Sequence, residues 1–279
     1  MNFYFVFEGK TEAIVYKEWF SILVPQLTEV NYFDEVDDSN YYQINGFGYP
    51  YCAQMIANAI QEINEIPKYD YLVLVTDADR LTVREKKDEI LKWINLELVD
   101  KTFKSLPENC KFETIVQNVC IETWFLGNRN FFVRHPQQNE TLKQYIKYFD
   151  VSQNNPEELA TEFIQNEENS NDIFGYKTKS LFHEGYLREI FKERNLSYSK
   201  SKPKEVQKEY YLQQLIIRIK ANANHLHSFQ DFLDFYSKID CQSKLQNSLD
   251  QLLSQCDPNA PIAESDHACL DINSVGQEL

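Results

Sequence analysis

The sequence contains little glycine or proline and no long apolar run, which excludes several classes of protein. Its 7 Gly and 9 Pro in 279 residues are too few for a fibrous or low-complexity chain. No segment approaches the ~18 consecutive apolar residues that a membrane span needs. The first residues, MNFYFVFEGKTE, have no basic lead and reach a charge at position 8, so we expect no signal peptide. We therefore expect a globular, cytoplasmic protein with no membrane partner.

Two chemical signatures are also missing. No glycine-rich loop ends in Gly-Lys-Ser or Gly-Lys-Thr, so we expect no nucleotide hydrolysis of the Walker A kind. The cysteines show no short C-x-x-C spacing, which favours reduced thiols over a zinc site or a disulfide framework. They are Cys52, Cys110, Cys120, Cys241, Cys256 and Cys269.

Acidic residues outnumber basic ones by 43 to 28, and the formal net charge is −15. This charge disfavours a protein that coats nucleic acid by bulk attraction. It does not exclude an enzyme that brings metal ions and a local basic patch to a phosphodiester. Aromatic residues make up 14% of the chain, which supplies enough apolar surface to argue against wholesale disorder.

The first half of the chain alternates between strand and helix patterns. Apolar runs predict strands, and residues at helical spacing predict the helices between them. This alternation predicts an α/β domain over residues 1–135 with a mainly parallel sheet. The predicted strands are 2–7, 41–44, 71–75 and 111–117, and the predicted helices are 10–24, 52–66 and 82–98.

After about residue 120 the strand signals fade. Helical patterns dominate, and we expect a helical C-terminal extension over residues 136–254. The segment 255–279 has five acidic residues, no Lys or Arg and no periodicity, so we expect a disordered acidic tail. The three tryptophans lie in apolar patterns and are predicted core residues; they are Trp19, Trp93 and Trp124.

The charge reverses locally, because residues 177–220 carry 11 basic and 5 acidic side chains. One interpretation is an ordinary solvated helix face. The other is a surface that contacts nucleic-acid phosphates. The candidate nucleic-acid-binding residues are Lys10, Lys177, Lys179, Arg188, Lys192 and Lys204.

Acidic side chains follow two of the predicted strands. The run Glu8-Gly9-Lys10-Thr11-Glu12 ends the first strand, and Asp77-Ala78-Asp79 ends the strongest one. The carboxyl ends of parallel strands are where ligands bind in open α/β sheets. Carboxylates that converge there repel one another unless a cation neutralises them, and hard oxygen ligands favour Mg²⁺ or Mn²⁺. Each motif alone also occurs as an ordinary turn.

The neighbours of Glu8 suit such a site. Gly9 lets the chain turn and bring its backbone close to a ligand. Thr11 can cap the following helix, whose free N–H groups favour an anion. Glu12 would lie in the first turn of that helix, either as a residue that complements the helix dipole or as a further metal ligand.

These two motifs, in this order, resemble the TOPRIM domain of topoisomerases, primases, recombination proteins and the overcoming-lysogenization-defect (OLD) nucleases. The resemblance covers roughly residues 1–130. It implies a Rossmann-like sheet and Mg²⁺-dependent breakage or transfer at phosphodiesters. It also implies that Glu8 is the general acid/base or a metal-linked residue, and that Asp77 and Asp79 bind metal. No topoisomerase cleavage domain and no primase zinc module is visible in the sequence.

A second segment, Ile121–Gly127 (IETWFLG), resembles the one that follows the sheet in small bacterial TOPRIM-like proteins of phage-defence operons. That resemblance implies a helical extension, an abortive-infection role and an ABC-type or OLD-like ATPase partner. It makes Glu122 a candidate metal ligand, with a polar residue at a helix start as the alternative. OLD-like nucleases also use a lysine outside the metal cluster, a role open to Lys200 or Lys202, for which a flexible lysine loop is the alternative.

Three hypotheses follow. The first is a metal-dependent nuclease that cleaves DNA or RNA and acts as the toxic effector of an antiphage system. The second is a non-catalytic TOPRIM-fold effector that docks on an ATPase partner. The third is a receiver- or phosphatase-like domain, which gives the Glu8–Glu12 motif no purpose. The sequence leaves the nucleic acid, the trigger and the oligomeric state open, a homodimer included.

Overall fold

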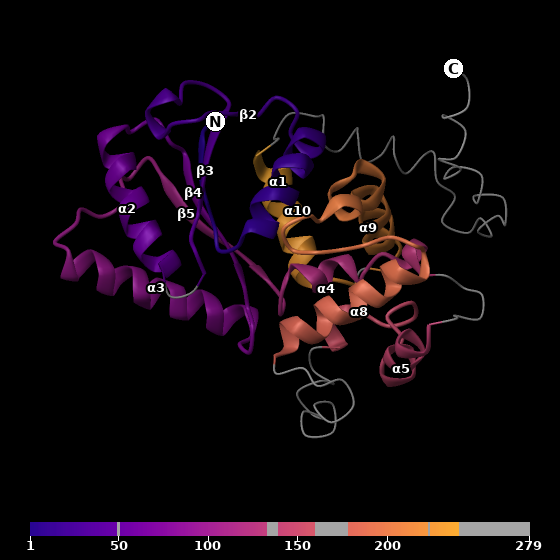
Figure 1. The fold of residues 1–279 in the computed structure, drawn as a ribbon. Coiled ribbons are helices and arrows are strands. Elements are labelled where there is room, and N and C mark those ends of the chain that lie inside the picture. The colour runs from indigo at the N-terminus through magenta and orange to yellow at the C-terminus, as the bar shows by residue number, and fades with distance from the viewer. Residues whose placement is uncertain (49–50, 133–138, 160–177, 223, 240–279) are drawn as a thin grey trace, which may run out of the picture.

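The protein is built around a five-stranded, all-parallel sheet with helices on both faces (Figure 1). The computed structural model describes residues 1–48, 51–132, 139–159, 178–222 and 224–239. The strand order is β2-β3-β1-β4-β5. An α/β fold with a parallel, Rossmann-like sheet is therefore confirmed. The strands are β1 (Phe3–Phe7), β2 (Thr28–Glu29), β3 (Asn40–Asn45), β4 (Tyr71–Asp77) and β5 (Lys111–Gln117).

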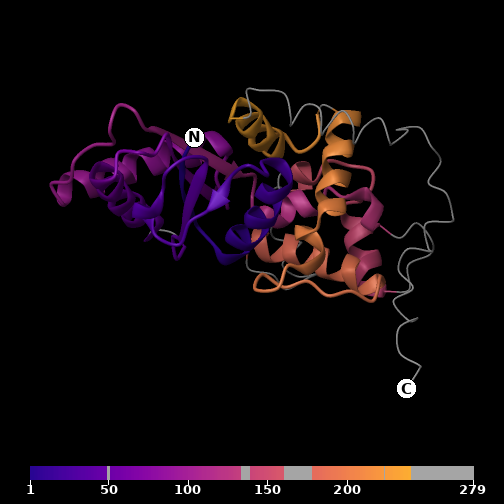
Figure 2. The ribbon, with the colours of Figure 1, turned by 90° about the horizontal axis from the view of Figure 1, so that it is seen from above.

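The central strand is apolar on both sides because helices cover both faces of the sheet. Phe3, Phe5 and Phe7 of β1 point to one face, which α1 (Lys10–Leu23) and α10 (His227–Ile239) cover. Tyr4 and Val6 point to the other face, which α2 (Tyr51–Glu65) and α3 (Val83–Asp100) cover. Figures 1 and 2 show the two helix layers on either side of the strands.

The chain leaves β1 and β4 toward opposite faces. The two strands are direct neighbours, but β1 runs into α1 on one face and β4 runs into α3 on the other. Such a point, where neighbouring connections diverge, is where open α/β sheets bind their ligands. Residues that follow Phe7 and Val75 are therefore placed at the switch point of the sheet.

The C-terminal helices share one core with the sheet. Trp19 of α1 and Trp124 of α4 are fully buried, and the rings of Phe229 and Phe232 from α10 pack against both. The proposed division between residues 135 and 136 falls outside the described residues, as does the segment 255–279. The other helices described in this part are α4 (Ile121–Phe125), α5 (Glu140–Tyr148), α8 (Lys179–Glu193) and α9 (Glu209–Ala221). The described 3-10 segments are Phe33–Glu35, Arg129–Phe131 and Lys204–Gln207.

Two expectations about the core were wrong or incomplete. Trp93 is 38% exposed on α3, whereas Trp19 and Trp124 are buried as predicted. The two-residue strand β2 was not predicted, because it is too short to carry an alternating pattern.

The described cysteines, Cys52, Cys110 and Cys120, are free and buried. Among the described residues no helix combines the length and the apolar character that a membrane crossing requires.

Gly127, at the end of the IETWFLG segment, has no room for a side chain. A Cβ atom there would lie 2.8 Å from the Trp124 carbonyl oxygen and would overlap the Leu226 side chain. We expect Gly127→Ala to lower the free energy of unfolding by about 1–3 kcal/mol through overpacking. Urea titration followed by circular dichroism measures this, with Lys143→Ala on the exposed face of α5 as the control. An unchanged urea midpoint for Gly127→Ala would contradict this packing.

Candidate functional site

Glu8 and Asp77 meet at the switch point. The Glu8 N–H donates to the Val75 carbonyl over 2.9 Å, which extends the pairing of β1 with β4 by one residue. The Glu8 carboxylate accepts hydrogen bonds from the Thr76 hydroxyl and, at 3.2 Å, from the Asp77 N–H. The first two acidic residues of the predicted site are therefore neighbours, as the sequence predicted.

Glu12 joins them from the first turn of α1. Its side chain is buried, and its Oε2 would lie 2.5 Å from a Cβ atom built on Gly9. A side chain at position 9 would therefore displace the Glu12 carboxylate, whereas the extended φ of −123° needs no glycine. The helix begins after Gly9 with no side-chain cap, so the predicted capping by Thr11 was wrong.

The Thr11 hydroxyl serves another purpose, because it ties the sheet to the helical extension. It donates to the Lys200 carbonyl at 2.9 Å. Lys200 Nζ lies 3.7 Å from Glu122 Oε1, and the same oxygen accepts a 2.8 Å hydrogen bond from the Tyr198 hydroxyl. The loop between α8 and α9 thus places the Lys200 ammonium and the Tyr198 hydroxyl beside the Glu122 carboxylate. Glu122 is fully buried at the start of α4.

The four carboxylates, Glu8, Glu12, Asp77 and Glu122, interact electrostatically. Burial, followed by the charges of Glu12, Glu8 and Glu122, raises the pKa of Asp77 well above its ordinary value. Burial also raises the pKa of Glu12 to about 7; its own backbone hydrogen bond opposes the shift, and Glu122 adds to it.

Lys200 is the cation that faces this cluster. Burial lowers the pKa of Lys200, but the charges of Glu122 and Asp77 contribute to a larger rise, so the net shift is upward. The same ammonium charge lowers the pKa of Asp77 and of Glu12. Lys200 therefore offsets part of the repulsion among the carboxylates.

Two carboxylate oxygens of the cluster have no hydrogen-bond donor beside them in the described structure. They are the buried atoms Asp77 Oδ1 and Glu122 Oε2. A buried carboxylate oxygen without a partner is costly, and a divalent cation is one group that satisfies several such oxygens at once. Within the described ranges, however, no three Asp, Glu, His or Cys side chains form a ready-made metal site. Glu8 and Glu122 are instead held by neighbouring donors of the protein.

Asp79 departs from the arrangement that the sequence predicted. It has a positive φ of 55°, and its half-exposed carboxylate lies 3.8 Å from Nζ of the buried Lys86. Its N–H donates to the Val119 carbonyl, at the end of β5. Asp79 thus lies at the same sheet edge as Asp77, but the interaction that the structure shows for its carboxylate is with a lysine.

The predicted basic residues differ in their surroundings. Lys10 and Lys202 are exposed. Arg188 pairs with Glu184 and Lys192 with Glu189 on the same helix, as in an ordinary solvated face. Lys204 donates to the Ser197 hydroxyl at 2.9 Å, Lys179 is buried, and Lys177 lies outside the described residues.

Three residues of this site were missed by the sequence analysis. Thr76 directly precedes Asp77 at the end of a strand, a position that could have marked it. Tyr198 lies two residues before Lys200, but nothing in the sequence shows that its hydroxyl reaches Glu122. Lys86 is one of several lysines on α3, and only its burial distinguishes it.

The architecture defines an α/β protein with a carboxylate and lysine site at the switch point of a parallel sheet. Comparison with protein-family models, curated proteins and solved structures gives no match to this chain. Arguments about its function therefore rest on the site itself.

The raised pKa of Glu12 gives a stability prediction. The folded protein holds the Glu12 proton more tightly than the unfolded chain, so folding stability falls as pH rises from about 4.5 to about 7. In EDTA at about pH 8 we expect Glu12→Gln to raise the free energy of unfolding by about 1–3 kcal/mol. The gain should vanish below about pH 4.5, where Glu12 is protonated in both states.

Urea titrations at several pH values measure this difference. Glu18→Gln on the exposed side of the same helix is the matched control and should change stability little at any pH. A Glu12→Gln protein that is less stable than the wild type at about pH 8 would show that the Glu12 charge is satisfied in the metal-free protein.

Proposed function

We propose that the protein is a Mg²⁺- or Mn²⁺-dependent nuclease that cleaves phosphodiester bonds in DNA or RNA. The observation that carries the proposal is a group of carboxylates around Lys200 at the switch point, in which two buried oxygens have no partner. Such a group suits a divalent cation and an anionic ligand together. The oxygens of a phosphodiester can bind a metal ion and accept hydrogen bonds from a lysine at the same time.

Asp77, Glu122 and Glu12 would hold the ion, since they supply the buried oxygens and the raised pKa values. When bound, the ion would polarise a phosphate oxygen and stabilise the charge that develops on it. Glu8 is less buried than Glu12 and Glu122, and its carboxylate is fixed by Thr76 and by the Asp77 N–H. It would accept a proton from the attacking water.

Lys200 would stabilise negative charge on the phosphate. Its ammonium group lies at the carboxylates and its side chain is 45% exposed, so it is open to a ligand as well as to the site. Lys202 is exposed in the same loop, and an antiparallel bridge joins it to Ser199. The ion pair with Glu122 therefore favours Lys200 over Lys202 for this role.

The proposed biological role is the toxic effector of an antiphage abortive-infection system, with an ABC-type or OLD-like ATPase as partner. It is supported by the resemblance of the Glu8–Glu12, Asp77–Asp79 and Ile121–Gly127 segments to TOPRIM-like defence proteins. The helical extension that delivers Lys200 is the part such proteins add to the sheet. A non-catalytic effector that docks on the ATPase is the alternative.

The nuclease proposal predicts metal-dependent cleavage that needs Glu8 and Asp77. Purified protein is incubated with plasmid DNA and with total RNA in Mg²⁺ or Mn²⁺, and the products are resolved on gels. We expect Glu8→Gln and Asp77→Asn each to reduce cleavage by at least about 100-fold while circular dichroism shows an unchanged fold. Folded variants that cleave like the wild type would refute the proposal, and a wild type inactive on both substrates would favour the non-catalytic effector.

The two lysines give a matched pair of variants. Lys200→Ala should lower kcat about 10²- to 10³-fold, because it removes a preorganised positive charge from the site. Lys202→Ala should leave kcat unchanged, since Lys202 is exposed and the ion pair with Glu122 is made by Lys200. Single-turnover cleavage assays at saturating metal measure both. Equal losses in the two variants would indicate a shared contact with the nucleic-acid backbone instead.

A further inference from the structure

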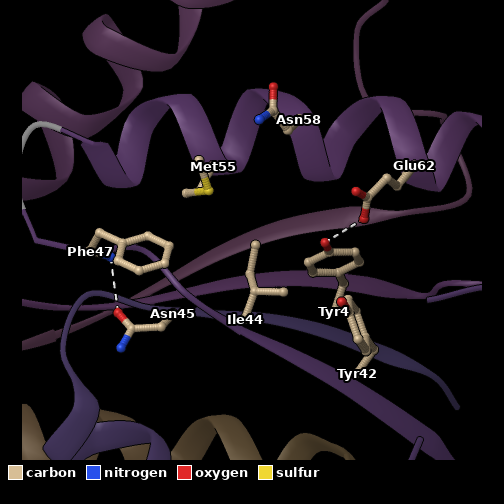
Figure 3. Close-up of a pocket in the computed structure, with 8 residues that line it drawn as sticks. All are labelled: Tyr4, Tyr42, Ile44, Asn45, Phe47, Met55, Asn58 and Glu62. Atoms are coloured by element: carbon tan, nitrogen blue, oxygen red, sulfur yellow. Dashed lines mark hydrogen bonds between the residues drawn. The ribbon is translucent and has the colours of Figure 1, made fainter. Parts of the chain in front are cut away.

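A pocket lined in part by the loop that follows β3 has no role in the chemistry described so far. It has a volume of about 390 Å³ and lies between β3 and α2, on the face of the sheet that α2 and α3 cover. Pockets of about 300–1,000 Å³ are typical of small-molecule sites. Figure 3 shows Phe47 at one end, Tyr4 and Tyr42 at the other, and Ile44 and Met55 between them.

Phe47 is an exposed aromatic residue whose backbone is held by hydrogen bonds. It is 73% exposed and has a positive φ of 58°. Its N–H donates to the Asn45 side chain at 2.9 Å, and the glycines on either side anchor the loop to β1. The Gly46 N–H donates to the Phe7 carbonyl at 2.6 Å and the Gly48 N–H donates to the Glu8 carbonyl at 2.9 Å.

These bonds place the Phe47 end of the pocket beside the backbone of Glu8. The Glu8 carbonyl accepts a hydrogen bond from the loop that contains Phe47, and the Glu8 carboxylate accepts one from the Asp77 N–H. A strand of nucleic acid whose phosphate lies at the carboxylates would therefore have a neighbouring base within the region of Phe47. The argument for this ligand rests on the proposed nuclease function.

The lining of the pocket combines flat apolar faces with hydrogen-bonding groups. Tyr4 and Tyr42 meet edge to face with ring centroids 5.1 Å apart, and the Tyr4 hydroxyl donates to Glu62 at 2.6 Å. Asn58 and Glu62 of α2 line the same space as Ile44 (Figure 3). A nucleobase has a flat face that stacks on aromatic rings and a polar edge that pairs with amides and carboxylates.

Charge decides which part of a nucleotide fits. The Glu62 carboxylate would repel a phosphate, so the sugar-phosphate backbone belongs outside the pocket. A carboxylate accepts hydrogen bonds, which favours bases that carry an exocyclic amino group. Cytosine and adenine suit this lining better than uracil or thymine do.

We propose that this pocket binds one unstacked base of a single-stranded substrate, with Phe47 as its stacking residue. The enzyme would then hold single strands, or locally opened duplexes, more tightly than intact duplexes. A base inside a duplex is stacked on both faces and cannot enter such a pocket without leaving the helix.

Binding is measured by fluorescence anisotropy with labelled 12-mers of oligo(C) and oligo(U) in Ca²⁺. Phe47→Ala should weaken oligo(C) binding about 5- to 150-fold, the effect of losing one base–aromatic stack. Met55→Trp, which fills the pocket, should weaken it as well. Tyr32→Ala is the matched control, because Tyr32 is a similarly exposed aromatic outside the pocket, and it should bind like the wild type.

A second measurement locates the base directly. An oligomer that contains 5-iodocytidine is photo-cross-linked to the wild-type protein, and the modified residue is identified by mass spectrometry. A cross-link to Phe47 or Tyr42 supports the proposal. Wild-type affinity in Phe47→Ala together with cross-links that lie only elsewhere would overturn it.

The two proposals fail in different ways. Binding that depends on Phe47 in a protein that cleaves nothing supports the pocket and contradicts the nuclease. Cleavage of single strands that is unaffected by Phe47→Ala and by Met55→Trp contradicts the pocket and supports the nuclease.

Discussion

The burial of several carboxylates around one lysine is the constraint on which the rest of this structure depends. Glu12, Glu122 and the Oδ1 atom of Asp77 are buried, and burial raises the pKa values of Glu12 and Asp77. An arrangement of this kind costs folding free energy unless a positive charge compensates it. Lys200 supplies part of that charge, and it comes from the helical extension, so the α/β part does not complete the site alone.

The loop that contains Lys200 is bonded to the α/β part of the protein. The Thr11 hydroxyl holds the backbone of Lys200, and the Trp19 indole donates to the Val206 carbonyl at 3.2 Å on the far side of the same loop. The loop is therefore bonded to α1 at two points, Lys200 and Val206. A precise position for the Lys200 ammonium requires this, because a side chain with four rotatable bonds is otherwise free to sample many positions.

The sheet and the acidic motifs could be predicted from the sequence, but their partners could not. Buried strands such as YLVLV and FYFVF carry their own signal, and parallel topology places the residues that follow them at one edge. That reasoning located Glu8 and Asp77 correctly. It did not reveal that Lys86 lies beside the Asp79 carboxylate. It failed for Thr11, because the helix already begins at Lys10 and the Thr11 hydroxyl bonds to a residue 189 positions away. It could not find Tyr198, whose role depends on the fold of the extension.

We propose above all that the buried oxygens of Asp77 and Glu122 bind a divalent cation. Crystals soaked in Mn²⁺ and measured near the manganese absorption edge test this most directly. The account predicts an anomalous peak about 2.0–2.3 Å from both Asp77 Oδ1 and Glu122 Oε2. A well-ordered site that shows no peak, with Lys200 still paired to Glu122, would contradict it.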